Sequence, residues 1–231
     1  DPIIWEVTKN TILYTVITVP VGMCISLLLA VMLDQKIAFR RFYRAAFFLP
    51  SITSMVVVAI VWQWIYNPDY GLLNYFLSLF GIKGPKWLLD ANTALVSRAI
   101  VVIWKRAVYD MIIFLSGLQG ISNSYYEASM LDGANKWQQF RYITLPMLKP
   151  TTFFVFVMAV ISSFQVFDQV MLMTKGGPGR SSSVLVHYLY QNAFQYFKLG
   201  YACAIAYLLF FIVMGVTVFN MRMEKSMREI Y

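Results

Sequence analysis

The chain has 231 residues, of which 59% are hydrophobic and 13% are charged, and its mean hydropathy is +0.62. Soluble domains are typically about 45–50% apolar and about 25% charged, so this composition excludes an ordinary soluble domain and indicates an integral membrane protein. The net charge of +8 does not indicate nucleic-acid binding, because the basic residues are scattered singly between apolar runs and form no continuous stripe.

Five apolar runs are long enough to cross a bilayer as helices, which takes about 20 residues. They cover residues 11–33, 43–66, 93–118, 151–173 and 201–221. The segments after the first, third and fifth runs carry many of the basic residues, namely Lys36, Arg40, Arg41, Arg44, Lys136, Arg141, Lys149, Arg222, Lys225 and Arg228. The positive-inside bias predicts that these segments are cytoplasmic. Five spans with a cytoplasmic C-terminus place residue 1 outside, so we expect one more span upstream.

Neither a disulfide framework nor a metal site is expected. Cys24 lies in the first apolar run and Cys203 in the last, with no CxxC spacing, so we expect two small buried hydrophobic residues. The only histidine, His187, has no second ligand at helical spacing, which argues against a metal or catalytic role.

The third run carries polar residues near its middle, where each charge costs at least about 2.5 kcal/mol. They are Trp104, Lys105, Arg106, Tyr109 and Asp110. Arg106 and Asp110 are four residues apart, so they share a helical face and are expected to form an ion pair. Two interpretations stay open: a purely structural pair, or residues that line a solute path.

The fourth run is expected to bring Phe164, Gln165 and Asp168 to a common face near its outer end, before a glycine-rich turn at residues 174–179. No GKS or GKT follows these glycines, so they indicate a loop and not a phosphate cradle. The outer segments are expected to hold short amphipathic helices around residues 72–80 and 181–197.

Residues 122–150 form a polar interval between the third and fourth runs. Ser124 and Glu127 have the spacing of a capping box, and Gly133 can end that helix in a left-handed conformation. Residues 136–142 can form a second short helix. The pattern predicts a helix, a turn and another helix outside the membrane, an element suited to docking on a partner. The alternative is that Glu127 only caps its own helix.

The next long helix is expected to open at Pro146 and Pro150, because a missing N–H matters little in a first turn. A spaced set also runs through the whole interval: Glu127, Ala128, Gly133, Ile143, Leu145 and Pro146. This set resembles the EAA loop of binding-protein-dependent ABC importer permeases. The third EAA position, usually Ala, is here Ser129, a change between small residues.

Three further passages make the chain similar to the permeases of carbohydrate ABC importers, the branch of maltose, multiple-sugar and glycerol-phosphate uptake. They are RRFYRAAFFLP at residues 40–50, FQVFD at 164–168 followed by MTKGGP at 173–178, and LGYACA at 199–204. The resemblance covers nearly the whole chain. It implies an all-α, polytopic transmembrane bundle of the MetI-like type I importer class, as one permease domain over residues 1–231 with a cytoplasmic coupling loop at 122–150. The family's own first helix has no counterpart here.

The resemblance also implies partners and site residues. The partners would be a second permease subunit, two cytoplasmic ATPase subunits that bind ATP and Mg²⁺, and an extracytoplasmic solute-binding protein, in the inner membrane of a prokaryote. Contact with the ATPase falls to Glu127, Ala128, Ser129, Asp132, Gly133, Ile143, Leu145 and Pro146. Candidates for the solute path are Arg106, Tyr109, Asp110, Phe164, Gln165 and Asp168.

Three other functions are weighed against sugar import. One is a permease for another solute, such as glycerol phosphate. Another is an integral-membrane enzyme that uses Arg106, Asp110 and Asp168 on a lipid-linked substrate, but these charges lack a defined acid and base arrangement. The third is a gated channel, but no filter-like repeat is present. No Walker motif, catalytic triad or zinc signature occurs in the chain, so we expect neither an enzyme nor a cofactor of its own.

Overall fold

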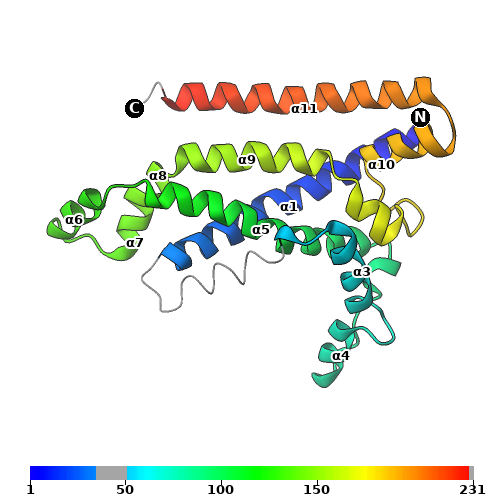
Figure 1. The fold of residues 1–231 in the computed structure, drawn as a ribbon, viewed down its shortest axis with the longest axis horizontal. Helices are drawn as coiled ribbons and strands as arrows, with labels where there is room; N and C mark the ends of the chain where they lie inside the picture. Colours follow the sequence, from blue (N-terminus) through cyan, green and yellow to red (C-terminus); the bar gives the residue numbers. More distant parts are fainter. Residues whose placement is uncertain (35–50, 229–231) are drawn as a thin grey trace. The chain divides into compact units, whose positions relative to one another are not determined.

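The computed structural model describes residues 1–34 and 51–228, and these residues form helices, turns and loops without a strand (Figure 1). They divide into two compact units. The first comprises the described parts of Asp1–Val19, Thr53–Ile103 and Ala159–Tyr231, and the second those of Pro20–Ile52 and Trp104–Met158. Three helices contribute to both units, namely α1 (Pro2–Asp34), α5 (Ala94–Gln119) and α9 (Lys149–Phe164).

The remaining elements belong to one unit each. The second unit holds α6 (Asn123–Leu131), α7 (Lys136–Gln139), a π-helical turn (Phe140–Thr144) and α8 (Leu145–Met147). The first unit holds α3 (Met55–Ile65), α4 (Leu72–Leu79), a 3-10 turn (Trp87–Leu89), α10 (Leu185–Tyr190), α11 (Leu199–Arg228) and π-helical turns at Val170–Thr174 and Gln191–Gln195. The short outer helix expected around residues 72–80 is therefore confirmed as α4.

Within the described residues, α1 and α11 are long and apolar enough to cross a membrane without interruption. A third span results if the pair Lys136–Met147 and Lys149–Phe164, bent by 64°, is counted as one. Helix α5 has 26 residues, which is long enough, but it carries four charged side chains. Only 11 residues of the second predicted span, 43–66, lie in α3. Residues 43–50 of this span lie outside the described residues, as do the RRFYRAAFFLP passage and the basic residues at 36–44.

The fourth predicted span is not one helix, because α9 ends at Phe164 and residues 165–167 are irregular. The expected common face is therefore wrong: Phe164 is buried, whereas Gln165 and Asp168 are exposed. Packing explains the break. It lets Val166 enter the first unit's core, and it brings the ring of Phe167 to 4.9 Å from that of Tyr190.

Two smaller expectations also fail. Cys24 and Cys203 are unpaired but exposed, because they lie on the outward faces of α1 and α11. The outer helix expected over residues 181–197 begins only at Leu185. The preceding serines are used in a turn instead, where Ser182 Oγ donates to the carbonyl oxygen of Gly177 at 2.6 Å.

Candidate functional site: the segment 122–150 and the polar residues of the spans

The start of α6 differs from the expected capping box. Its N-cap is Ser122, whose hydroxyl accepts a hydrogen bond from the backbone N–H of Ser124 at 3.3 Å. Glu127 lies in the middle of α6 and is exposed, and its carboxylate has no hydrogen bond or ion pair with any residue that the structure describes. The interpretation that Glu127 only caps its own helix is therefore wrong, and the carboxylate is available to a partner.

The end of α6 is as expected. Gly133 has a φ of +78°, and the backbone N–H groups of the two residues after the C-cap donate to carbonyl oxygens in the last turn of α6. Gly133 N–H donates to Met130 O at 3.1 Å, and Ala134 N–H donates to Ser129 O at 2.9 Å. These two bonds make a Schellman motif, in which a left-handed glycine satisfies the last carbonyls of the helix.

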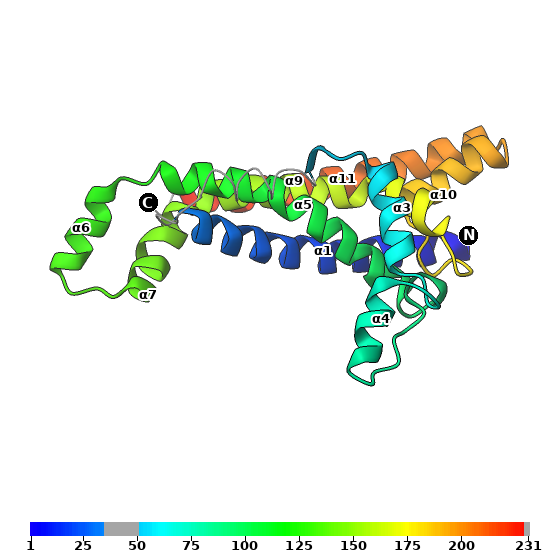
Figure 2. The ribbon, with the colours of Figure 1, turned by 60° about the horizontal axis from the view of Figure 1, so that its bottom comes forward.

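The second helix begins with the capping box that the first one lacks. Asn135 Oδ1 accepts from the backbone N–H of Gln138 at 2.9 Å, and Gln138 Oε1 accepts from that of Asn135 at 2.7 Å. The helical course continues through the π-helical turn into α8, which has Pro146 in its first turn, and Pro150 is the second residue of α9. The predicted second helix and the proline positions are confirmed, and both ribbon views show α6 leading away from α5 and α7 leading back (Figures 1 and 2).

Two side-chain hydrogen bonds join the two arms of this segment, and a third orients Ser129 within α6. Gln139 Nε2 donates to Ser129 Oγ at 3.0 Å, and Ser129 Oγ donates to the carbonyl oxygen of Tyr126 at 2.8 Å. The hydroxyls of Tyr126 and Thr144 lie 2.9 Å apart. Ser129, the departure from the usual Ala, thus has a use within the chain, since its hydroxyl accepts the bond that joins α6 to α7.

The predicted coupling residues fall into two groups by exposure. Glu127, Ala128, Asp132 and Gly133 are exposed, whereas Ser129, Ile143, Leu145 and Pro146 are half-buried.

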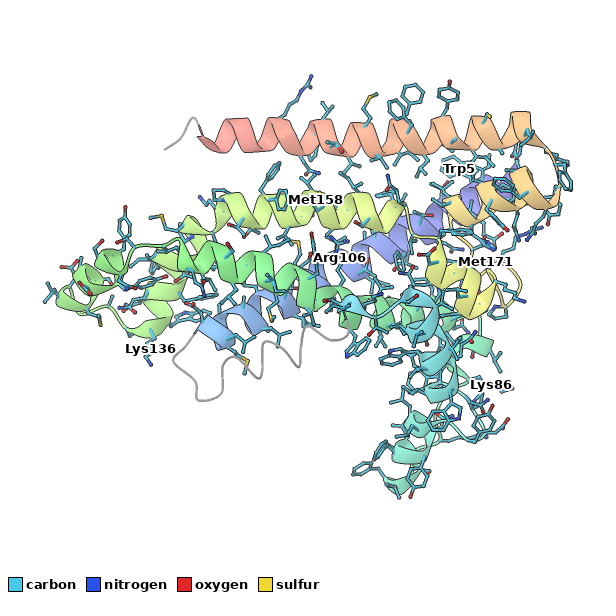
Figure 3. The ribbon with its side chains drawn as sticks, in the orientation of Figure 1. Trp5, Lys86, Arg106, Lys136, Met158 and Met171 are labelled. Carbon is cyan, nitrogen blue, oxygen red and sulfur yellow. The ribbon has the colours of Figure 1, made fainter. Side chains whose placement is uncertain are left out.

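Two large apolar side chains at the same end were missed in the sequence. Leu131 is 90% exposed and Trp137 is 67% exposed. Both stand in an otherwise polar interval, and that contrast is the signal that could have found them. Lys136, labelled in Figure 3, marks the start of α7 beside them.

The base of the segment is packed tightly within the second unit. A Cβ on Gly117 of α5 would lie 2.5 Å from Thr151 Oγ1 of α9, so the two helices approach closely there. Leu118 and Leu148 are buried beside them in a cluster that also contains Ala30 of α1. The base of the segment thus joins α5, α9 and α1 in one close-packed cluster.

The ion pair predicted in the third span is present. Arg106, labelled in Figure 3, places its Nε 3.0 Å from Asp110 Oδ2 on the same face of α5. The Asp110 side chain is only 2% exposed, and its Oδ1 has no hydrogen-bond partner among the described residues. Tyr109, by contrast, is exposed and not grouped with this buried pair. The other three candidates, Phe164, Gln165 and Asp168, lie in the first unit.

Arg98 is a charged residue that the sequence interpretation overlooked. Its side chain is fully buried in the first unit, and its guanidinium carbon lies 5.5 Å from the centre of the Tyr14 ring. Among the described residues its three guanidinium nitrogens have no hydrogen-bond partner. Its position within the third apolar run could have identified it in the sequence, because charged residues are rare in membrane spans.

His187 lies in the first turn of α10, directly after the serine-rich turn. The ring is buried, and its Nδ1 lies 2.9 Å from Ser183 Oγ. Burial, and then the nearby charge of Arg98, lowers the pKa of His187 below its ordinary value. Gly176, with a φ of +83°, passes so close that a Cβ would lie 2.6 Å from His187 Cε1. The first glycine of the Gly-Gly-Pro turn, Gly176, is therefore required by packing against His187. Among the described residues, no group of three or more His, Cys, Asp or Glu side chains is placed to hold a metal ion.

Known proteins share this arrangement over most of the chain. Residues 22–224 match the family described as "Binding-protein-dependent transport system inner membrane component". The probable ABC transporter permease protein YurN of Bacillus subtilis is 37% identical over 99% of this chain and 80% of its own. The lactose transport system permease protein LacF of Rhizobium radiobacter is 34% identical over 99% of this chain and 78% of its own.

A solved structure agrees. A bacterial ABC transporter involved in the import of the acidic polysaccharide alginate matches with a TM-score of 0.88 and 25% identity, over 96% of this chain and 78% of that one. The match with the family covers far more than half of the sequence. The chain therefore belongs to the binding-protein-dependent transport system inner membrane component family, and it is a membrane permease subunit of an ABC importer rather than an enzyme.

Proposed function

We propose that this importer carries a sugar, released by a binding protein, across the cytoplasmic membrane by alternating access. One observation carries the proposal: several relatives that match over nearly the whole chain are named for sugars or sugar derivatives. They include the lactose permease, a sulfoquinovosyl glycerol permease of Agrobacterium fabrum at 35% identity, and an arabinooligosaccharides permease of Bacillus subtilis at 31%.

The proposed assembly contains a second permease subunit, two ATPase subunits that bind ATP and Mg²⁺, and an extracytoplasmic binding protein. Support comes from a structural neighbour, the alginate transporter in complex with an alginate pentasaccharide-bound periplasmic protein, with a TM-score of 0.89. In such an assembly the permease binds no nucleotide itself, so its contribution is mechanical.

We further propose that residues 122–150 dock on an ATPase subunit. The unpaired carboxylate of Glu127 is suited to a charge-assisted hydrogen bond with an arginine of that subunit. Leu131 and Trp137 present apolar surface at the same end, which a groove on the partner would remove from water. The Schellman turn at Gly133 and the bonds through Ser129 keep the docking surface in one conformation, so little ordering entropy is lost on docking.

The half-buried members of the set serve a different purpose in this proposal. Ile143, Leu145 and Pro146 lie on the arm that returns to α9. They would hold this arm against the segment's own interior, while Ala128 and Asp132 stay exposed toward the ATPase. Force from the ATPase would then reach α5 and α9 together through the packed base at Gly117.

For the solute path the proposal rests on the interruption after α9. Irregular backbone at membrane depth is tolerated only where protein buries it or where it lines a water-filled cavity. Gln165 and Asp168 are exposed at this interruption, so they are suited to hydrogen bonding with a sugar, beside the buried ring of Phe164.

The polar residues of α5 are the other candidates for the path. Tyr109 is exposed and offers an aromatic face for stacking on a sugar. Arg106 and Asp110 neutralise one another in the present conformation, which also suits a structural pair. They would face the solute only if the pair opens during transport.

The test is uptake by the complete importer in proteoliposomes, with a panel of labelled mono-, di- and oligosaccharides and glycerol 3-phosphate. We expect accumulation of a sugar that requires both ATP and the binding protein. Accumulation of glycerol 3-phosphate alone would overturn the sugar assignment. Flux without nucleotide, or turnover of a lipid-linked substrate by the isolated chain, would overturn the transport mechanism.

A further inference from the structure

Helix α4 exposes its apolar side instead of burying it. The outer face of α4 consists of Leu72, Tyr75, Phe76, Leu79 and Phe80, which follow the i, i+3, i+4, i+7, i+8 spacing of a single helical stripe. All five are exposed, up to 80% for Phe80, and α4 has no buried residue. Acidic and basic side chains are absent from the helix. Such a contiguous apolar stripe marks an interaction surface.

The opposite side of α4 is fixed to its own unit. Asn74 Nδ2 donates to the carbonyl oxygens of Pro68 at 3.0 Å and Pro85 at 3.3 Å, and Trp87 Nε1 donates to Asn74 Oδ1 at 2.7 Å. Leu73 packs against the cluster that contains Tyr66. Because these contacts hold the helix from behind, the outer face cannot turn inward, and it stays presented to its surroundings.

The position of α4 along the chain places it at a membrane surface. The apolar helix α3 carries the exposed Trp64 in its last turn, a side chain that prefers the membrane–water interface. Only residues 67–71 separate this end from α4, and both ribbon views show α4 projecting beyond α3 (Figures 1 and 2). After α4 the chain enters α5, whose 26 residues span about 39 Å at 1.5 Å per residue. The short link between α3 and α4 therefore places α4 at the membrane surface where α3 ends.

The chemistry of the outer face matches a lipid interface. Three of its five side chains are aromatic, and Tyr70 adds an exposed phenol just before the helix. Lys83 and Lys86 are exposed on the segment that returns from α4, where Lys86 is labelled in Figure 3, and they are suited to lipid phosphate. A soluble partner that comes and goes would leave this uncharged stripe in water for part of each cycle, whereas lipid covers it at all times.

We propose that α4 is an interfacial anchor, with its outer face inserted at the boundary between headgroups and acyl chains of the leaflet at which α3 ends. The anchor would hold the outer ends of α3 and α5 at a fixed depth while other parts of the importer move. This inference depends only on membership of the inner-membrane family, so the identity of the solute does not affect it.

The test uses the complete importer in lipid nanodiscs, with Cys24 and Cys203 replaced by alanine. A single cysteine replaces Phe76 on the outer face or, as the matched control, Ser78, which is exposed on α4 but lies off the stripe. Each cysteine carries a bimane fluorophore, and quenching by dibrominated phosphatidylcholine is compared with quenching by aqueous iodide. Leu79→Cys repeats the measurement at a second stripe position, in case one substitution disturbs assembly.

We expect brominated lipid to quench the label at Phe76 and Leu79 at least threefold more than the label at Ser78, and iodide to show the reverse order. Equal lipid quenching at stripe and control positions would overturn the proposal. So would protection of the stripe labels from both quenchers, which indicates burial against the second permease subunit. A stripe signal that appears only when the solute-binding protein is added would also overturn it, because the face would then be a protein-docking site.

Discussion

Gly133→Ala tests whether the coupling segment works as a preformed element. The φ of Gly133 is +78°, and a Cβ at this position would meet no atom within 4 Å. The substitution is therefore opposed by backbone conformation alone and not by a clash. A left-handed conformation costs a residue with a side chain about 1–2 kcal/mol, which shifts the equilibrium between the closed and the frayed end of α6 by about 5–30-fold.

Hydrogen exchange of the reconstituted importer measures this shift directly. The amides of Gly133 and Ala134 donate to Met130 and Ser129, so peptides that cover residues 128–135 should exchange about 5–30-fold faster in Gly133→Ala. Gly133→Asn should show a smaller increase, because asparagine tolerates the left-handed region better.

The matched control is Gly200→Ala. Gly200 has no positive φ and no atom within 4 Å of a Cβ, so its own helix should keep its exchange rate or become slightly more protected. Exchange in Gly133→Ala as slow as in the wild-type chain, or an equal loosening of its helix by Gly200→Ala, would show that the left-handed glycine does not preform the segment.

Three further predictions concern the packing of Gly117, the hydrogen bond between Gln139 and Ser129, and the buried His187. Gly117→Ala should lower stability by about 1–3 kcal/mol through overpacking against Thr151, and Thr151→Ala in the same chain should recover most of the loss in a denaturation series. Ser129→Ala removes the acceptor of Gln139, so exchange of α7 should rise about 2–10-fold, corresponding to about 0.5–1.5 kcal/mol. Burial, the main cause, keeps the pKa of His187 below 6.5, so as the pH falls the unfolded chain takes up a proton before the folded chain does. Thermal stability should therefore fall as the pH drops below 6.5, and it should fall less in His187→Gln.

The sequence predicted the features that depend on local chemistry. Gly133 is left-handed, Pro146 and Pro150 open helical turns, and Arg106 pairs with Asp110, because each needs only its neighbours within four residues. The sequence placed a capping box at the start of α6, where the structure has none, because the helix boundary was predicted wrongly. The Ser124 to Glu127 spacing was correct in form, but the helix starts two residues earlier, and helix ends are the least reliable part of such predictions.

The features that the sequence could not supply depend on contacts between distant segments. The break at residues 165–167 follows from the burial of Val166 in a core that includes Tyr14, and no local signal reveals this. Likewise, the bond from Gln139 to Ser129 joins two helices across a turn.

If the segment 122–150 couples ATP hydrolysis to transport, the ratio of sugar taken up to ATP hydrolysed in proteoliposomes depends on its contact with the ATPase. Glu127→Lys replaces an unpaired, exposed carboxylate, and Glu6→Lys makes the same change at an exposed position of α1. Loss of a charge pair of at least about 2 kcal/mol predicts a ratio about thirtyfold lower for Glu127→Lys and an unchanged ratio for Glu6→Lys. A wild-type ratio in Glu127→Lys would mean that the contact of Glu127 with the ATPase does not couple hydrolysis to transport.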